Sequence, residues 1–304
     1  MTDYLVGTGG WAYFKVPGES SLEVYSRVFN FVEVNYTFYE YPDVKRVEHW
    51  RRVVPTNFTF SVRCHQDLTH RIGLRPTDEA YGVLARMTEY CSVLDSPFLV
   101  LETPRRYVLD SKAMSDARDF LLSANLKGVQ LVWDVRASLT AEVTELMENL
   151  GIVQSVDLSR QEPVVSSDMV YSRLFGKGWH NRYQFTDNEL LDIDSKVEKA
   201  KPKVAALSYH GMRMNIDAAR FRTFKKTGQF IPITSFTGLE SAKAVLAEDT
   251  KFPSSKEELI REQGWKVIDL TAAKRVHLSD MLLKIPGKTY NNLDDVVTAL
   301  EAVV

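Results

Sequence analysis

The stretch VEVNYTFYEYP, residues 32–42, is the segment from which the fold of the chain can be worked out. Apolar and polar residues alternate over 32–37, which predicts a β-strand with one polar face. An aromatic cluster follows and ends at Pro42. Glu33 and Asn35 on one strand face, next to a rigid aromatic loop, suit the wall of a pocket. The alternative is a half-exposed strand whose polar groups meet only solvent.

Length and composition restrict the class of protein. A chain of 304 residues with 44% hydrophobic residues is long enough for one large α/β barrel with an appendage. Cys64 and Cys91 lack metal-ligand spacing, which predicts buried thiols and a cytoplasmic protein. No export signal or membrane-spanning stretch is predicted. The net charge of −2 gives no general attraction to polyanions, so binding of nucleic acid would need a local basic patch.

Strands and helices are predicted to alternate along most of the chain. From Thr77, apolar residues recur at intervals of three and four, which is typical of an amphipathic helix, and similar segments separate the other strands. Eight strands with a repeat of about 28 residues predict a (β/α)8 TIM-type barrel that closes near residue 230. The predicted strands are 4–7, 32–37, 58–62, 98–101, 129–133, 152–156, 169–175 and 204–207.

The remaining residues break this alternation. We expect residues 1–230 to form the barrel, 231–250 a linker and 251–304 a small helical C-terminal module. Ser20 with Glu23 and Thr186 with Glu189 have the spacing of capping boxes at helix starts, and Ser254 and Ser255 with the KEEL that follows offer another.

Charged residues follow several of the predicted strands. In a barrel of this kind the carboxyl ends of the strands meet at one face, where active sites lie. Arginine suits bidentate binding of phosphate or carboxylate, and paired carboxylates can act as general acid and base. The sequence therefore predicts an anionic, phosphate-bearing ligand, and the alternative is a ring of internal salt bridges. The residues expected at this face are Glu33, Asn35, Arg63, His65, Glu102, Asp134, Arg136, Asp157, Arg173 and His210.

Two sets of site residues follow from this placement. The predicted catalytic residues are Glu33, Asp134, Arg136 and Arg173. The predicted substrate-binding residues are Trp11, Asn35, Tyr39, Arg63, His70, Glu102, Asp157 and His210. The aromatic residues Trp11, Tyr13, Phe38, Tyr39 and Trp133 form either a stacking wall for a base or sugar, or ordinary core.

Other kinds of site have weaker support. A divalent metal held by His65, His70 and His210 is not favoured, because no HExxH-like spacing is present. The run Gly7–Gly10 lacks the full dinucleotide fingerprint, and no nucleophile elbow is visible. The cofactor and the oligomeric state are left open.

Several motifs together resemble a known family. GTGGWAY (7–13), VEVNYTFYEYP, FTFSVRCHQDLTH (58–70), WDVR (133–136) and YSRLFGKG (171–178) are similar to those of the YecE-like family, domain of unknown function 72. The resemblance covers roughly residues 1–228 and implies a (β/α)8 barrel without an established activity. Comparison of the family's barrel mouth with endonuclease IV-like barrels implies DNA binding, so nucleic acid stays an open partner.

The resemblance also assigns positions. The family's Glu and Asn fall on Glu33 and Asn35, and its strand-seven Arg falls on Arg173. Its Lys, Thr-His pair and Glu-x-Arg fall on Arg63, Thr69 with His70, and Asp134 with Arg136. This chain departs from the family at Glu102 (usually Gln), Ala137 and Phe175 (usually His), and Tyr209 with His210 (usually an Asn pair). The tail from FPSSKEEL (252–259) to TYNNLDDVVTAL (289–300) resembles domain of unknown function 2795.

Three functional hypotheses follow. The first is a hydrolase acting on a phosphate ester of a nucleic acid or nucleotide, with Arg63, Arg136 and Arg173 holding the phosphate. Glu33 or Asp134 would then position or deprotonate water. The second is a carbohydrate-active enzyme that uses Glu33 and Asp134 as its carboxylate pair. The third is a non-catalytic protein that binds an anionic ligand.

Overall fold

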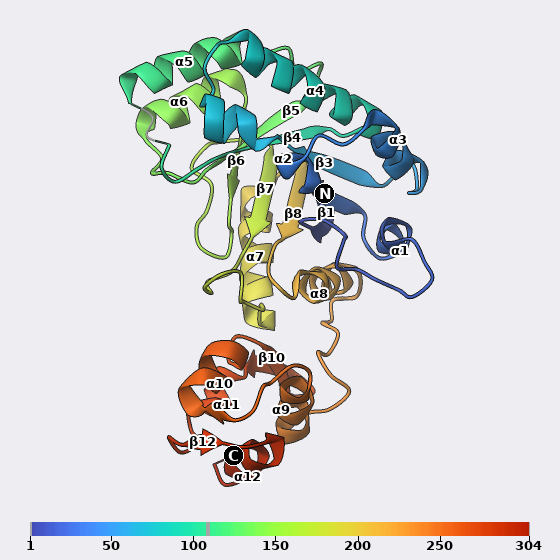
Figure 1. The fold of residues 1–304 in the computed structure, drawn as a ribbon, viewed down its shortest axis with the longest axis vertical. Helices are drawn as coiled ribbons and strands as arrows, with labels where there is room; N and C mark the ends of the chain where they lie inside the picture. Colours follow the sequence, from blue (N-terminus) through green and yellow to red (C-terminus); the bar gives the residue numbers. More distant parts are fainter. Residues whose placement is uncertain (1, 108–109, 304) are drawn as a thin grey trace. The chain divides into compact units, whose positions relative to one another are not determined.

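The computed structural model, which describes residues 2–107 and 110–303, contains a closed barrel of eight parallel strands arranged in sequence order (Figure 1). The first strand pairs with both the second and the eighth, which closes the sheet. The predicted (β/α)8 barrel is therefore confirmed. The strands are β1 (Asp3–Thr8), β2 (Phe31–Val34), β3 (Thr59–Arg63), β4 (Phe98–Thr103), β5 (Gln130–Val135), β6 (Val153–Val156), β7 (Met169–Leu174) and β8 (Val204–Tyr209).

Helices connect most of these strands, and the predicted start signals explain several of them. Thr77 caps the helix α4 (Asp78–Leu94) by accepting a hydrogen bond from the amide of Ala80, and Thr140 caps α6 (Ala141–Leu150) in the same way, through the amide of Val143. Ser20 makes no such bond, so the capping box predicted there is wrong. The helices are α1 (Ser21–Val28), α2 (Tyr36–Tyr39), α3 (Val44–Arg52), the π-helical η1 (Asp67–Ile72), α4 (Asp78–Leu94), α5 (Ser111–Leu122), α6 (Ala141–Leu150), α7 (Asp187–Ala200) and α8 (Met214–Thr227).

The second strand is shorter than the sequence predicts. Strand β2 ends at Val34, and Tyr36–Tyr39 form the short helix α2 instead of continuing the strand. The hydroxyl of Thr37 donates to the carbonyls of Val34 and Arg63, at 2.8 and 2.6 Å. These bonds draw the chain into a turn at the end of the strand, which alternation of side chains cannot reveal.

The connection between β6 and β7 is the exception to the alternation, because residues 157–168 contain no helix. Without a helix, some backbone amides of this connection need other acceptors. The side chain of Gln154 accepts hydrogen bonds from the amides of Val164 and Val165, at 2.7 and 3.1 Å. The amide of Leu158 donates to Ser172. These bonds satisfy backbone groups that a buried irregular segment would otherwise leave unpaired.

Apolar side chains fill the barrel below the strand ends. The ring of Tyr171 packs edge-on against Phe31 and Phe98, with centroid separations of 6.2 and 5.8 Å. A ligand must therefore bind at the rim, as is usual for this fold. The interior cluster comprises Leu5, Phe31, Phe98, Val100, Val132, Val153, Tyr171 and Ala206.

The chain divides into two compact units. The first runs to Leu174 and includes Lys196–Tyr209, so it holds the whole barrel sheet. The second consists of Phe175–Ser195 and the chain from His210 onward, and its apolar core includes Leu246, Leu259 and Tyr290.

The C-terminal part of the second unit contains both helices and short strands. The capping boxes predicted at Ser255 and at Thr186 are confirmed. The predicted linker 231–250 contains the helix α9, so calling all of it a linker is wrong. The elements are α9 (Gly238–Ala247), β9 (Ser254–Ser255), α10 (Lys256–Gln263), β10 (Val267–Thr271), β11 (Lys274–His277), α11 (Ser279–Leu282), β12 (Thr289–Tyr290) and α12 (Leu293–Glu301). Strands β10 and β11 pair with each other, as do β9 and β12.

Within residues 2–107 and 110–303, no helix combines the length and the apolar character needed to cross a membrane.

Candidate functional site at the barrel mouth

Arg173, near the end of β7, is the centre of a group of ion pairs at the barrel mouth. Its Nη1 atom contacts Glu102 of β4 and lies 2.6 Å from Asp134 of β5, and its Nη2 atom lies 3.1 Å from Glu33 of β2. The Arg173 side chain is only 2% exposed. A guanidinium with no access to water requires such partners, because desolvation of a charge is costly.

Glu33 lies beneath this arginine and is fully buried. Its second oxygen accepts a hydrogen bond of 2.9 Å from the hydroxyl of Tyr171, which also lies 2.6 Å from the hydroxyl of Ser61. Burial and the neighbouring Glu33 carboxylate raise the pKa of Tyr171 well above its ordinary value, so the phenol stays protonated. The lower edge of the site is thus a closed hydrogen-bonded layer on the apolar barrel interior.

Arg63 and Arg136 form the outer part of the group. Glu102 Oε2 accepts from Arg63 Nη2 at 2.8 Å and from Arg136 Nη2 at 3.3 Å, and Arg136 Nε lies 3.1 Å from Asp134. Arg63 also donates to Asn35 at 3.2 Å, and Asn35 donates to the carbonyl of Gly9 at 2.8 Å. We call these seven residues the mouth cluster: Glu33, Asn35, Arg63, Glu102, Asp134, Arg136 and Arg173.

Charge within the mouth cluster is balanced, with three carboxylates and three guanidiniums. Burial alone would raise the pKa of Glu102, but attraction by Arg173, Arg63 and Arg136 outweighs it and lowers the pKa to about 2. Burial, followed by repulsion from Arg173, lowers the pKa of Arg63. This arrangement corresponds to the ring of internal salt bridges that the sequence left open as an alternative.

One donor in the mouth cluster lacks a partner among the described residues. The Nε atom of Arg63 is buried and makes no hydrogen bond to them, while the guanidinium carbon lies 3.6 Å from the centroid of the Phe38 ring. A buried unpaired donor on a cation is a natural place for an anionic ligand to bind.

A hollow of about 420 Å³ opens on the side of η1 and α5, and its lining residue His70 packs edge-on against Phe38, the ring that contacts Arg63 of the mouth cluster. His70 connects the two: it lines the hollow, and burial lowers its pKa while the charges of Glu102, Arg63 and Arg106 also act on it. The hollow has more basic than acidic side chains. Its charged and imidazole residues are His70, Arg71, Arg75, Arg106, Asp110, Lys112 and Asp116.

Several predicted site residues make contacts away from the mouth cluster. Asp157 accepts from the amide and hydroxyl of Ser159 in its own turn, and lies 3.6 Å from Arg160. His65 stacks on Tyr41, with ring centroids 3.8 Å apart. His210 belongs to the second unit, where its ring stacks on Phe175 at 4.7 Å.

The predicted aromatic residues do not share one environment. Trp11 packs edge-on against Trp50, and Tyr39 is exposed and packs against Phe38. Trp133 is fully buried and donates to Thr103, as expected of core, whereas Tyr13 is 84% exposed. A single stacking wall made of all five predicted rings is therefore wrong.

Sequence reasoning missed two residues that shape the site. Tyr171 donates to Glu33, and Ser61 contacts the hydroxyl of Tyr171, whereas Phe38, named as a candidate for a stacking wall, packs against the guanidinium of Arg63. Tyr171 and Arg173 are two residues apart on one strand, so their shared face was a usable signal. Within residues 2–107 and 110–303, no group of three or more His, Cys, Asp or Glu side chains is arranged to hold a metal ion.

Comparison with known proteins gives one family and several structural relatives. The family model described as "Protein of unknown function DUF72" matches residues 5–221. A search of curated proteins found no match.

Three solved structures have a similar fold. A DUF72 family protein from Thermotoga maritima has 18% sequence identity and a TM-score of 0.61, covering 74% of this chain and 99% of its own. One from Enterococcus faecalis has 15% identity and a TM-score of 0.58, covering 75% and 98%. A D-tagatose 3-epimerase-like protein has 13% identity and a TM-score of 0.50, covering 74% and 96%. At these identities the likeness concerns the fold alone.

Proposed function

Because this chain belongs to the DUF72 family of proteins of unknown function, its activity has to be argued from its own site, and we propose that the barrel mouth hydrolyses a phosphate ester. The observation that carries the proposal is the meeting of Arg63 and Arg136 on Glu102, next to the hollow that His70 borders. Arginine donors held in place beside a basic hollow suit the oxygens of a phosphate.

The depth of each group decides the role that we give it. Arg63 and Arg136 lie in the outer part of the mouth cluster and bind the phosphate oxygens. Arg173 and Glu33 are shut off from solvent, so they act as positioning residues that hold Asp134 and Glu102 in place. This differs from the sequence-based hypothesis, which gave Arg173 and Glu33 direct catalytic roles.

In the proposed reaction Asp134 is the general base. Water attacks the phosphorus atom, the Asp134 carboxylate accepts a proton from that water, and the ester P–O bond breaks. The leaving alkoxide takes up a proton from solvent. Arg63 and Arg136 stabilise the charge on the phosphoryl oxygens in the transition state. Asn35 holds Arg63 through a hydrogen bond and His70 borders the hollow, and we assign Trp11 and Tyr39 to the rest of the substrate.

The position of Arg173 argues against glycoside hydrolysis. Its guanidinium contacts Glu33 through Nη2 and Nε, and Asp134 through Nη1. The arginine thus lies between the two carboxylates, where a glycosidic bond would have to be placed. A carbohydrate-active enzyme that uses Glu33 and Asp134 as its carboxylate pair is therefore not favoured.

The test combines phosphate binding with hydrolysis. Inorganic phosphate binding is measured by calorimetry, and turnover of p-nitrophenyl phosphate and bis(p-nitrophenyl) phosphate by absorbance, with EDTA and with Mg²⁺ or Mn²⁺. We expect Arg136→Ala to weaken phosphate binding about tenfold or more, since a charge-assisted bond contributes ~1.5–3 kcal/mol. Asp134→Asn should bind phosphate but lose turnover.

Arg27→Ala is the matched control, because Arg27 is an exposed ion-pairing arginine outside the mouth cluster. It should change neither binding nor turnover. If wild-type protein neither binds phosphate nor hydrolyses either ester, the proposal is wrong. Turnover of the diester but not the monoester would identify a nucleic acid rather than a nucleotide as the natural substrate class.

We further propose a cytoplasmic location, on the basis of the two cysteines. Both thiols are free and buried, and burial raises the pKa of Cys91 to about 12. Such thiols are unreactive and typical of a reducing compartment. Fractionation of cells that express the protein tests this location. The resemblance of the tail to domain of unknown function 2795 stays a prediction.

A further inference from the structure

We propose that the second compact unit contains a binding site of its own, for a planar aromatic ligand that carries an anionic group. The site is a hollow of about 510 Å³, which lies within the usual range of small-molecule sites, about 300–1,000 Å³. Every residue that lines it belongs to the second unit. They are Gly178, Trp179, His180, Arg182, Tyr183, Ile260, Arg261, Gly264, Trp265, His277 and Ser279.

Aromatic rings dominate the lining. Trp179 is 78% exposed, although its large apolar indole ring would be stabilised by burial. Trp265, which also lines the hollow, is half-buried. Tyr183 and His277 also line the hollow, with their ring centroids 5.1 Å apart. Ring faces of this kind bind flat ligands by stacking, with little dependence on the details of the ligand.

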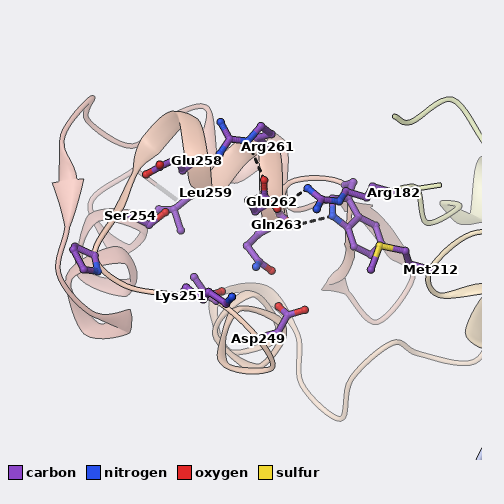
Figure 2. Close-up of a pocket in the computed structure, with 13 residues that line it drawn as sticks. Arg182, Met212, Asp249, Lys251, Ser254, Glu258, Leu259, Arg261, Glu262 and Gln263 are labelled. Atoms are coloured by element: carbon purple, nitrogen blue, oxygen red, sulfur yellow. Dashed lines mark hydrogen bonds and ion pairs between the residues drawn. The ribbon is translucent and has the colours of Figure 1, made fainter. Parts of the chain in front are cut away.

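Charge around the hollow favours an anion. Among the described residues that line it, the charged side chains are Arg182 and Arg261, and none carries a carboxylate. Glu262, in the wall of a neighbouring hollow of about 380 Å³, lies between the two arginines and pairs with them at 2.5 and 2.9 Å (Figure 2). The two charged groups in the lining itself are thus both cationic, whereas the carboxylate that pairs with them lies outside it.

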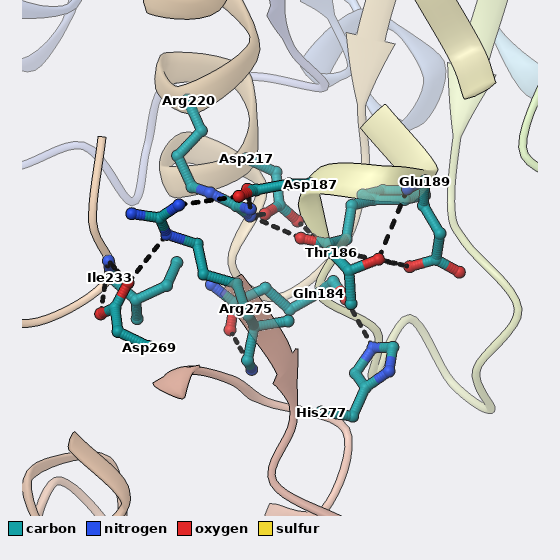
Figure 3. A network of polar contacts seen from close by, with 12 residues as sticks. Gln184, Thr186, Asp187, Glu189, Asp217, Arg220, Ile233, Asp269, Arg275 and His277 are labelled. Carbon is teal, nitrogen blue, oxygen red and sulfur yellow. Dashed lines mark hydrogen bonds and ion pairs between the residues drawn. The ribbon is translucent and has the colours of Figure 1, made fainter. Parts of the chain in front are cut away.

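Part of the lining is held in position by a buried polar network (Figure 3). The side chain of Gln184 accepts from the amide of Val267 at 2.8 Å, and its carbonyl lies 2.8 Å from His277 Nε2. The hydroxyl of Tyr183 donates to Glu189, which in turn accepts from Thr186. Tyr183 and His277 therefore have fixed positions before a ligand arrives, which lowers the entropic cost of binding.

The loop that carries Trp179 is folded tightly. His180 and Asn181 have φ values of 50° and 61°, in the left-handed region, which His and Asn adopt more often than most other non-glycine residues. A Cβ atom on Gly178 would lie 1.9 Å from the carbonyl oxygen of Arg182, so only glycine fits there. These backbone requirements limit the conformations open to the loop, and a loop fixed in this way costs less entropy to bind a ligand.

The experiment titrates the full-length protein with adenosine 5′-monophosphate and follows tryptophan fluorescence, with calorimetry to obtain Kd. Adenosine and ribose 5-phosphate test the ring and the anion separately. We expect saturable binding of the monophosphate, with weaker binding of each fragment. Trp179→Ala should raise Kd about tenfold, in line with ~1–3 kcal/mol for stacking on one ring. Trp179→Phe should restore most of the affinity.

Three further variants distinguish binding in this hollow from binding at the barrel mouth or elsewhere on the surface. Arg261→Ala should weaken binding of the monophosphate but not of adenosine, because only the monophosphate carries an anionic group that Arg261 can bind. Phe236→Ala, at an exposed ring of the same unit outside the hollow, should change nothing. Arg136→Ala, at the barrel mouth, should weaken any binding there but leave unchanged the saturable binding that Trp179→Ala weakens.

Two results would overturn the proposal. One is the absence of saturable binding of the monophosphate. The other is binding that Arg136→Ala abolishes and Trp179→Ala leaves unchanged, which would place the ligand at the barrel mouth. Failure of phosphate-ester hydrolysis at the mouth has no bearing on either result, so the two proposals can fail separately.

Discussion

Arg173 Nη2 lies 3.1 Å from Glu33 Oε1, and both side chains are almost completely shut off from solvent. Arg27 and Glu19 are closer, at 2.6 Å, yet both are more than one-third exposed. The distance alone therefore does not show which ion pair matters more for stability. Removing the partner of a desolvated charge destabilises the protein far more, because that charge then stays buried without compensation.

Removing the buried carboxylate should destabilise the protein strongly. Glu33→Gln leaves Arg173 without one of its charged partners, and we expect the free energy of unfolding to fall by about 3–5 kcal/mol. Glu19→Gln, in the exposed pair, should cost about 0–1 kcal/mol. Urea denaturation of both variants measures the difference. Equal effects of the two substitutions would contradict a structural role for the mouth cluster.

Acid should weaken the fold through Glu102. Its pKa in the folded protein is about 2, below the value of about 4.3 for an unperturbed glutamate. The unfolded chain then binds more protons between these values, so the stabilisation is complete above about pH 4.3 and is lost as the pH falls towards 2. Urea midpoints measured across this range should decline less steeply in Glu102→Gln. An unchanged slope in that variant would show that Glu102 is not the group responsible.

The phenol beneath Glu33 should contribute to stability. Tyr171→Phe removes the hydroxyl that donates to Glu33 and contacts Ser61, and leaves both groups short of a buried partner. We expect a loss of about 1–3 kcal/mol. Tyr13→Phe, at a ring that is 84% exposed, serves as the control and should have almost no effect. Thermal unfolding of the two variants tests the expectation, which fails if Tyr171→Phe unfolds at the wild-type temperature.

Two glycines should respond in opposite directions to the same substitution. A Cβ atom on Gly7 would lie 1.8 Å from the carbonyl oxygen of Phe31 on the neighbouring strand, so Gly7→Ala should disrupt the β1–β2 contact. Gly82, within α4, has open space around the same position, so Gly82→Ala should stabilise the helix by about 0.5–1 kcal/mol. Calorimetry should show a lower unfolding temperature for Gly7→Ala and a higher one for Gly82→Ala. An unchanged unfolding temperature for Gly7→Ala would mean that β1 and β2 can move apart at no cost in stability.

The barrel could be predicted because its signals are local. Apolar alternation, helical spacing and caps such as Thr77 and Thr140 depend only on residues near one another in the sequence, and eight such units have one common arrangement. The same argument placed Glu33, Arg63, Glu102, Asp134 and Arg173 at one rim, because parallel strands all end on the same side. The short strand β2 escaped prediction, since Thr37 forms its decisive bond with Arg63, 26 residues away.

The sequence by itself therefore determined the architecture and the identity of the charged groups at the mouth. Only the tertiary structure decided how those groups are paired: Arg173 with three carboxylates, Glu33 on the hydroxyl of Tyr171, and Arg63 over the ring of Phe38. Burial and partner choice depend on side chains that reach across the barrel from strands more than 100 residues apart in the chain, such as β2 and β7. No local pattern in the sequence contains that information, because it arises only when the sheet closes.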